Sequence, residues 1–146
     1  LSHHSDFIIA SDQAKLIEVF VNVGLVLDSG SSYFLPRVVG SNRAFELATM
    51  GSKVSAQQAK EWGMINRVVP DDQLDEEVAQ VVGYYVKAPT KAISMMKQML
   101  NKSFHSDLNE MLQYEAYCQE IAGFSSDYKE GVTAFNEKRK PEFKGE

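Results

Sequence analysis

Cysteine is nearly absent from this 146-residue sequence, which contains only Cys118. A single cysteine excludes an internal disulfide framework and a metal site built from several thiolates. The sequence also has no apolar run of the roughly 18 residues that a membrane-spanning helix requires. Its first residues lack the basic and apolar regions of a signal peptide. We therefore expect a protein of a reducing, cytoplasmic compartment.

Basic residues are outnumbered by acidic ones, 15 against 20, which gives a formal net charge of −5. Nucleic-acid-binding domains usually present a basic face, so no nucleic-acid partner is expected. Hydrophobic residues make up 44% of the sequence, which is usual for a globular protein. A length of 146 residues fits one domain, and no repeat or low-complexity tract interrupts it.

An apolar run over residues 19–27 ends in one carboxylate, Asp28, which a Ser/Gly turn follows. A turn and then a short helix are expected over residues 29–39, ending near Gly40. Asp28 has two interpretations. It could be a helix cap that accepts a hydrogen bond from a free N–H group of the first turn. It could instead lie at the edge of an apolar pocket, where burial raises its pKa and lets it transfer protons. Spacing alone favours the cap and leaves both interpretations open.

Short apolar runs rich in β-branched residues predict strands over residues 6–10 and 14–20, and a short extended segment over residues 65–69. The remainder of the chain shows the apolar spacing of helices. These helices have more apolar surface than so little sheet can cover. The sequence therefore indicates that the chain needs a protein partner.

Several residues are expected to begin or end the helices. Residues 41–42 and Ser106 are predicted caps. Ser55 and Gln58 have the spacing of a capping box, in which each side chain bonds to the backbone of the other residue. Gly51 is a predicted helix end.

His3 and His4 are adjacent near the start of the sequence. Neighbouring side chains point in different directions on a strand and on a helix, so a surface position or a tag remnant is favoured over a metal-binding pair. No metal site is expected. Trp62, at the end of a packed helix, is expected to lie in the core.

Four stretches of the sequence share their order and spacing with the motifs of one family. They are residues 24–30 (Gly-Leu-Val-Leu-Asp-Ser-Gly), 35–40 (Leu-Pro-Arg-Val-Val-Gly), 55–66 (Ser-Ala-Gln-Gln-Ala-Lys-Glu-Trp-Gly-Met-Ile-Asn) and 130–139 (Glu-Gly-Val-Thr-Ala-Phe-Asn-Glu-Lys-Arg). The chain from Asp6 onward thereby resembles the crotonase superfamily, the enoyl-CoA hydratases and isomerases. The resemblance is greatest to the phenylacetate-pathway ring-epoxide and enoyl-CoA isomerases, which also have Asp at the position of Asp28.

The resemblance implies an α/β fold, the crotonase (ClpP-like ββα superhelix) fold, of which this chain is similar to the C-terminal half. Residues 1–70 would be the C-terminal part of the core, with the last strands. Residues 71–146 would be a helical region for trimerisation and coenzyme A contact. The expected partners are the missing N-terminal half, which would supply the backbone N–H groups of an oxyanion hole, and further copies in a homotrimer or hexamer.

The resemblance also implies chemistry on an acyl-CoA substrate with no cofactor beyond that thioester. Family hydratases have a glutamate four residues before the motif glycine, where this sequence has Phe20; Glu18 is two residues out of register. One visible carboxylate, Asp28, favours an isomerase that shifts a double bond, of the 2-enoyl/3-enoyl or ring-epoxide type. A hydratase-like or dehalogenase-like enzyme, or an inactive acyl-CoA-binding fragment, remains an alternative.

The family's binding residues transfer to four positions of this sequence. Phe20 and Leu25 would line the acyl pocket, whereas Phe135 and Lys138 would contact the adenine and a phosphate of coenzyme A. The pattern of the last helix alone favours a core phenylalanine and a solvated lysine, and only the match to the family motif makes the two interpretations equal. Arg37 is expected to fix the short helix rather than to bind substrate.

Overall fold

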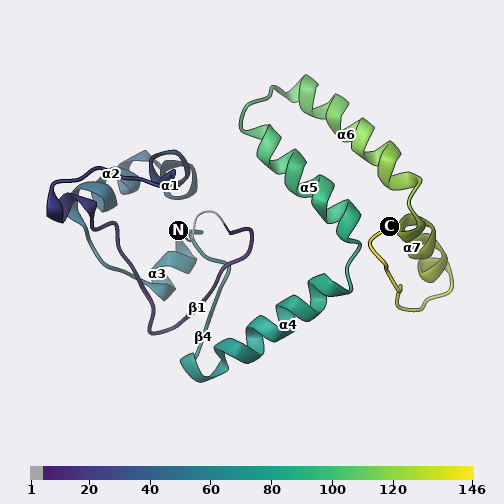
Figure 1. The fold of residues 1–146 in the computed structure, drawn as a ribbon, viewed down its shortest axis with the longest axis horizontal. Helices are drawn as coiled ribbons and strands as arrows, with labels where there is room; N and C mark the ends of the chain where they lie inside the picture. The colour runs from purple at the N-terminus through teal and green to yellow at the C-terminus, as the bar shows by residue number, and fades with distance from the viewer. Residues whose placement is uncertain (1–4) are drawn as a thin grey trace. The chain divides into compact units, whose positions relative to one another are not determined.

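The structure, a computed structural model, describes residues 5–146 (Figure 1). The chain forms two compact units, the first ending at Ala79 and the second running from Gln80 to Glu146. Helix α4 (Leu74–Val86) contains the boundary. The sequence predicted a division near residue 70. The roles predicted for the two parts, core on one side and trimerisation with coenzyme A contact on the other, stay predictions.

The first unit combines short strands with helices and 3₁₀ turns. Its elements are β1 (Ile9–Ser11), β2 (Lys15–Leu16), η2 (Phe20–Val23), α1 (Ser31–Val39), α2 (Ser41–Met50), β3 (Val54–Ser55), α3 (Ala56–Glu61), β4 (Arg67–Val69) and η3 (Asp71–Gln73). Strand β1 pairs in parallel with β4, with Ala10 opposite Val68. Strand β2 pairs antiparallel with β3. The expected α/β class is confirmed.

Leu35 lies at the centre of the apolar core of this unit, with 0% of its surface exposed. The core residues around it come from the helices and from β3: Ala44, Leu47, Val54, Ala56, Ala59, Met64 and Ile65. Trp62 packs against this cluster, as expected. The core fixes α1, and therefore the turn that precedes α1.

The strand expected over residues 14–20 is wrong beyond its first residues. Only Lys15–Leu16 is a strand, and Phe20–Val23 forms the 3₁₀ helix η2. Extended backbone needs a neighbouring strand for its hydrogen bonds, and β3 offers β2 a partner of two residues. Gly24, with φ of 72°, ends η2. The other two expected strands are present in shortened form, as β1 and β4.

The expected helix ends are partly confirmed. The Oγ of Ser55 accepts a hydrogen bond from the Gln58 N–H group, and the Ser55 N–H group donates to Gln58, which completes the capping box. Gly51 ends α2 in a left-handed conformation. The cap expected at residues 41–42 is wrong, because Gly40 holds that position with φ of 80°, a conformation suited to glycine.

Ser106 is also not the cap of its helix. The Oδ1 of Asp107 accepts the hydrogen bond from the Glu110 N–H group instead, at 2.9 Å. A carboxylate is favoured near the positive end of the helix dipole, which accounts for the difference of one residue.

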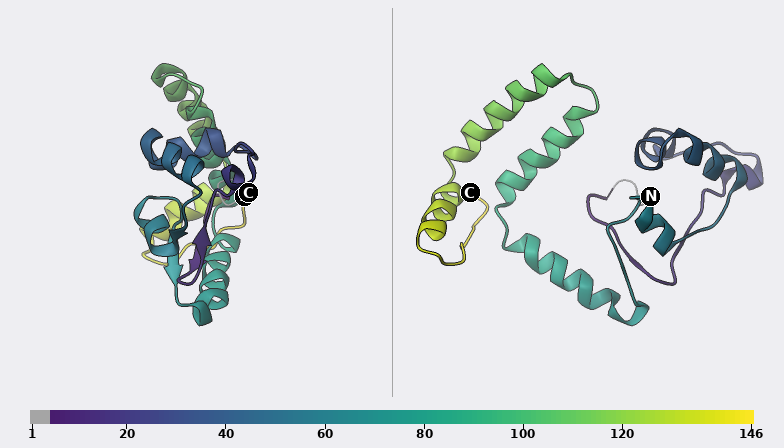
Figure 2. Two further views of the ribbon diagram at one scale, coloured as in Figure 1. Left: turned by 90° about the vertical axis from the view of Figure 1, so that its left-hand side faces the viewer. Right: turned by 180° about the vertical axis from the view of Figure 1, so that it is seen from behind.

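The second unit is helical. After the end of α4 it contains α5 (Thr90–Ser103), α6 (Leu108–Gly123) and α7 (Ser126–Asn136). Helices α5 and α6 lie side by side as a hairpin (Figures 1 and 2), and Met95, Met99 and Leu112 line the groove between them. Large apolar side chains remain exposed on both helices. Within residues 5–146, no helix is both long and apolar enough to cross a bilayer.

Residues 138–146, here named the C-terminal strap, run back along α7. Asp127, 5% exposed, holds the far end of the strap: its two carboxylate oxygens accept hydrogen bonds from the backbone N–H groups of Lys144 and Gly145, at 2.7 and 2.9 Å. Gly145 has φ of 81°, and a Cβ there would lie 2.3 Å from the Thr90 Oγ1. A residue with a Cβ at this position would therefore be strained and would have to displace the Thr90 side chain.

Glu130 holds the near end of the strap. Its carboxylate accepts two parallel hydrogen bonds from the Arg139 guanidinium, at 2.6 and 2.9 Å, and one from the Glu142 N–H group at 2.8 Å. The Nε of Arg139 also donates to Glu137 at 2.6 Å. The guanidinium, and then the Glu142 amide, lower the pKa of Glu130 to about 2. The pKa of Arg139 is raised by the same carboxylates.

We predict that Leu35→Ala destabilises the protein by about 2–5 kcal/mol, because it leaves a cavity in a closed core. Urea unfolding at neutral pH measures the effect. Val38→Ala, on the exposed side of the same helix, is the control and should cost well under half as much. Equal losses in the two variants would contradict the central role of Leu35.

We predict that acid weakens the closure of the strap. The folded-state pKa of Glu130, about 2, lies below the value of about 4.3 for an unfolded glutamate. The stabilisation is therefore complete above about pH 5 and is lost as the pH falls toward 2. In urea unfolding, Glu130→Gln should show a weaker pH dependence over this range than the unchanged protein. Glu120→Gln, an exposed position on α6, should keep the full dependence.

Candidate functional site

Asp28 lies on a tight turn between η2 and α1. The Asp28 carbonyl accepts a hydrogen bond from the Ser31 N–H group at 2.9 Å, and both residues between them have positive φ, 49° at Ser29 and 77° at Gly30. Two central residues of positive φ are typical of a type I′ turn. The turn places the Asp28 carboxylate directly before the first turn of α1.

The cap interpretation of Asp28 is wrong. Gly30 is the N-cap of α1, and no side chain supplies the cap hydrogen bond. Within residues 5–146, the Asp28 carboxylate takes part in no hydrogen bond or ion pair, and its residue is exposed. Its role as a proton-transfer group stays a prediction.

The turn stores strain beside this carboxylate. A serine with positive φ costs about 1–3 kcal/mol relative to an ordinary conformation, and such residues cluster at functional sites. In residues 5–146, the non-glycine residues with positive φ are Ser29 and Lys138. Ser29 directly follows Asp28, the predicted proton-transfer residue. Lys138 is itself a predicted binding residue.

Phe20 and Leu25 lie at the same reversal of the chain. The Leu25 N–H group donates to the Phe20 carbonyl at 2.9 Å, across the left-handed Gly24. Phe20 is half-buried, whereas Leu25 is 64% exposed. The other exposed apolar side chains of this segment are Val19, Val21, Val23 and Val26; with Leu25 they are here named the apolar turn face. An exposed apolar group of this size marks a surface that another molecule or segment covers.

Two contacts hold this part of the unit in place. The Asn22 side chain lies against Gly51, where an added Cβ would come within 3.0 Å of it. Arg37 donates to the Tyr33 carbonyl at 2.8 Å, with its guanidinium 3.7 Å from the centre of the Tyr33 ring. These contacts lie within α1 and agree with the expectation that Arg37 fixes the short helix; that it does not bind substrate stays a prediction.

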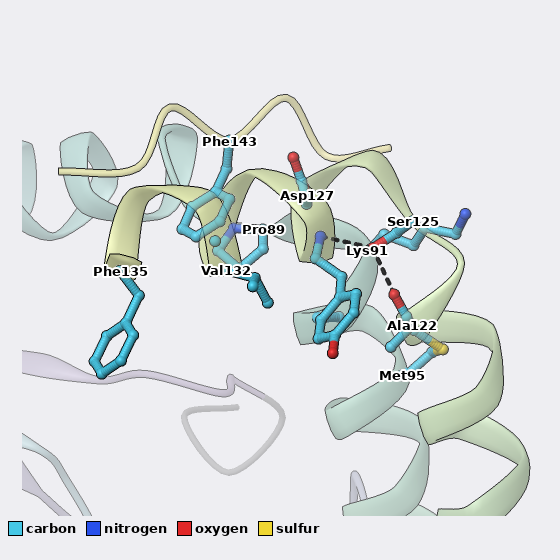
Figure 3. Close-up of a pocket in the computed structure, with 12 residues that line it drawn as sticks. Pro89, Lys91, Met95, Ala122, Ser125, Asp127, Val132, Phe135 and Phe143 are labelled. Carbon is cyan, nitrogen blue, oxygen red and sulfur yellow. Dashed lines mark hydrogen bonds between the residues drawn. The ribbon is translucent and has the colours of Figure 1, made fainter. Parts of the chain in front are cut away.

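Phe135 lies on α7 in the second unit. It is 83% exposed, so its alternative assignment to the core is wrong. It lies at the rim of a cavity of about 370 Å³ that α5, α6, α7 and the strap enclose. Figure 3 shows Phe143 of the strap reaching toward Pro89 and Val132, whereas Phe135 points away from this group. An exposed aromatic face of this kind can stack on a flat ligand.

Lys138 ends α7 in the backbone pattern of a Schellman motif. The Lys138 N–H group donates to the Phe135 carbonyl at 3.2 Å, and the Arg139 N–H group donates to the Ala134 carbonyl at 3.0 Å. Lys138 occupies the left-handed position with φ of 55°, where glycine is usual. Its contact with a phosphate stays a prediction, as does the adenine contact of Phe135.

In the first unit a backbone hydrogen bond joins Phe20 to Leu25, and Asp28 follows Leu25 by three residues. In the second unit Phe135 and Lys138 lie within four residues of one another. His3 and His4 lie outside the described residues. Within residues 5–146, no cluster of three or more His, Cys, Asp or Glu side chains could hold a metal ion.

Sequence reasoning missed Asp127 and Glu130, whose carboxylates hold the strap. The glycine and proline of the last residues suggest a turn, but no local pattern pairs residue 127 with residues 144–145, which lie 17 and 18 positions away.

The sequence of this chain is similar to those of known proteins. The enoyl-CoA hydratase/isomerase family model matches residues 1–146. The 1,2-epoxyphenylacetyl-CoA isomerase of Escherichia coli K12 is 41% identical over 140 residues, which is 96% of this chain and 53% of that protein. The trans-2-decenoyl-[acyl-carrier-protein] isomerase of Streptococcus mutans is 35% identical over 141 residues, 97% of this chain and 54% of that protein.

A solved structure agrees with these matches. The crystal structure of an enoyl-CoA hydratase from Bacillus anthracis superposes with a TM-score of 0.92 at 33% identity, over 99% of this chain and 56% of that one. The chain therefore spans about half the length of the curated relatives it matches. With matches along its whole length in both sequence and fold, the chain belongs to the enoyl-CoA hydratase/isomerase family and has the fold of the C-terminal part of the crotonase superfamily.

Proposed function

We propose that this chain carries the proton-transfer group of an acyl-CoA isomerase, with Asp28 as that group. The observation that supports it is the environment of Asp28: an exposed carboxylate, engaged by no other group in residues 5–146, on a strained turn beside the apolar turn face. Two relatives that are themselves named isomerases match nearly the whole chain.

In the proposed reaction, Asp28 removes a proton from one carbon of the acyl group and returns it to another carbon. The double bond moves between them, and no atom is gained or lost. The intermediate is an enolate, whose negative charge forms on the thioester oxygen. Backbone N–H groups that face this oxygen would stabilise it by a few kcal/mol each. A bound acyl chain over the apolar turn face would exclude water from Asp28.

Phe20 favours isomerisation over hydration. Addition of water usually requires a second group to orient the water molecule, and the family hydratases have a glutamate at the position of Phe20. The half-buried phenyl ring at that position has no oxygen atom that could accept a hydrogen bond from a water molecule, as a carboxylate would. A single carboxylate is sufficient when the same proton is handed back to the substrate.

The remaining parts of the proposed enzyme come from other segments. An N-terminal half would supply the oxyanion-hole N–H groups, and further copies would complete a homotrimer or hexamer. Phe135 would stack on the adenine of coenzyme A, and Lys138 would bind a phosphate. No cofactor beyond the coenzyme A thioester is proposed. The setting proposed for the enzyme is the reducing cytoplasm.

A non-catalytic function is the second candidate: the chain could bind acyl-CoA or assist assembly without catalysing a reaction. The exposed apolar turn face and the exposed Phe135 ring are surfaces that would suit such binding. A hydratase-like or dehalogenase-like reaction by the complete protein is the other alternative. Product analysis from a panel of acyl-CoA substrates distinguishes these possibilities from isomerisation.

We predict that Asp28→Asn in the complete protein lowers kcat for 2-enoyl/3-enoyl interconversion by about 10²–10⁴-fold, the usual contribution of a positioned acid–base group. The KM should change little, because asparagine keeps the shape of the side chain. Asp12→Asn, an exposed aspartate of the same unit, is the matched control and should keep full turnover. An Asp28→Asn enzyme of unchanged turnover would remove Asp28 from the mechanism.

We also predict that this chain alone has no isomerase activity, since the oxyanion-hole donors would lie in the N-terminal half. Calorimetry with an acyl-CoA, on the chain and on the complete protein, measures binding independently of turnover. Isomerase activity of the purified chain would refute this division of the site. Turnover by the complete protein would exclude the non-catalytic alternative for that protein.

A further inference from the structure

We infer that Arg139 and Glu130 are positioning residues, which hold Lys138 in a left-handed turn and keep its ammonium group available for a phosphate of coenzyme A. The inference deepens the proposed function and rests on it, because Lys138 is the proposed phosphate contact. It adds two residues to which neither the motifs nor the proposed reaction gives a role at this site.

The first observation is the conformation of Lys138 itself. Lysine stands at φ of 55° in the Schellman position, where the absence of a Cβ makes glycine the favoured residue. A strained residue persists only where the surrounding structure determines its conformation, and such residues mark functional sites. At Lys138, a glycine would keep the backbone turn and lose only the ammonium group.

The second observation is how Arg139 determines that conformation. Its guanidinium joins α7 to the residue after the turn: Nη1 and Nη2 donate to the Glu130 carboxylate at 2.6 and 2.9 Å, and Nε donates to Glu137 at 2.6 Å. Bidentate pairs of this kind fix geometry as well as charge. Lys138 lies between Glu137 and Arg139 in the chain, so this bridge spans it.

The third observation concerns charge. Glu137, the immediate neighbour of Lys138, is engaged by Arg139, as is Glu130. The Lys138 side chain makes no ion pair with any described residue. Arg139 thus engages the adjacent Glu137 carboxylate, which would otherwise compete with a phosphate for the ammonium group. Glu130 also accepts the Glu142 N–H group, which ties the strap beyond Pro141 to the same point of α7.

The experiment measures calorimetric dissociation constants of two probes, coenzyme A and phosphate-free pantetheine, on the complete protein. Lys138→Gly should weaken coenzyme A binding by about tenfold or more, the loss expected for one charge-assisted contact. It should also raise the midpoint of urea unfolding.

Arg139→Lys keeps a positive charge but cannot make the three guanidinium hydrogen bonds to Glu130 and Glu137. Glu130→Gln keeps the size and shape of the side chain but removes its negative charge. Both should weaken coenzyme A binding by about three- to tenfold and leave pantetheine binding unchanged. Lys129→Gln, an exposed lysine of α7, is the control.

The outcomes separate this inference from the proposed function. If Lys138→Gly weakens coenzyme A binding while Arg139→Lys and Glu130→Gln leave it unchanged, the positioning role is overturned and the phosphate contact stands. If these two variants weaken the binding of both probes equally, they act only through stability, and the positioning role is again overturned. If Lys138→Gly leaves coenzyme A binding unchanged, the phosphate contact of the proposed function is itself wrong.

Discussion

A left-handed backbone at a serine and at a lysine is the constraint on which both parts of the candidate site depend. At Ser29 the positive φ reverses the chain and sets Asp28 at the start of α1 without using its side chain as a cap. At Lys138 it ends α7 and turns the chain into the strap. Each conformation costs free energy that glycine would largely avoid. Different contacts hold the two turns, and they differ with the group that each turn exposes: a carboxylate at Asp28 and an ammonium group at Lys138.

The turn at Asp28 is held by apolar packing, because α1 is fixed in the core by Leu35. It borders the apolar turn face, where Leu25 and its valine neighbours are exposed. At about 25 cal/mol per Å² of apolar surface, leaving that face in water costs several kcal/mol. A ligand or protein segment that covered this face would also exclude water from the Asp28 carboxylate. The turn at Lys138 is held instead by ion pairs and backbone hydrogen bonds, which suit a group that meets a charged ligand in water.

Local chemistry could be read from the sequence, and contacts between distant residues could not. The capping box of Ser55 and Gln58 and the left-handed Gly51 depend on residues within one turn, so spacing was sufficient to predict them. The strand expected through residue 20 failed because apolar composition alone does not provide a partner strand. The hydrogen bonds from the strap to Asp127 were also missed because they join distant residues. Asp127 pairs with residues 17 and 18 positions away, and an aspartate at the start of a helix already has a local explanation in the helix dipole.

For the site residues too, the sequence indicated which positions matter but not the contacts around them. The motif positions Asp28, Phe135 and Lys138 follow from a resemblance, yet the sequence could not show how each is presented. The structure adds that Asp28 is no cap, that Phe135 is exposed, and that Lys138 stands where glycine would be more stable. Stability and function make opposite demands on that position, since the residue that best satisfies the backbone has no charge to offer. In the proposed site the Arg139 guanidinium reconciles these demands: it would hold the lysine in its strained turn while it engages the adjacent Glu137 carboxylate. The same guanidinium binds Glu130 on α7, so the contacts that join the start of the strap to α7 are also those that would leave the Lys138 ammonium group without an ion pair among the described residues.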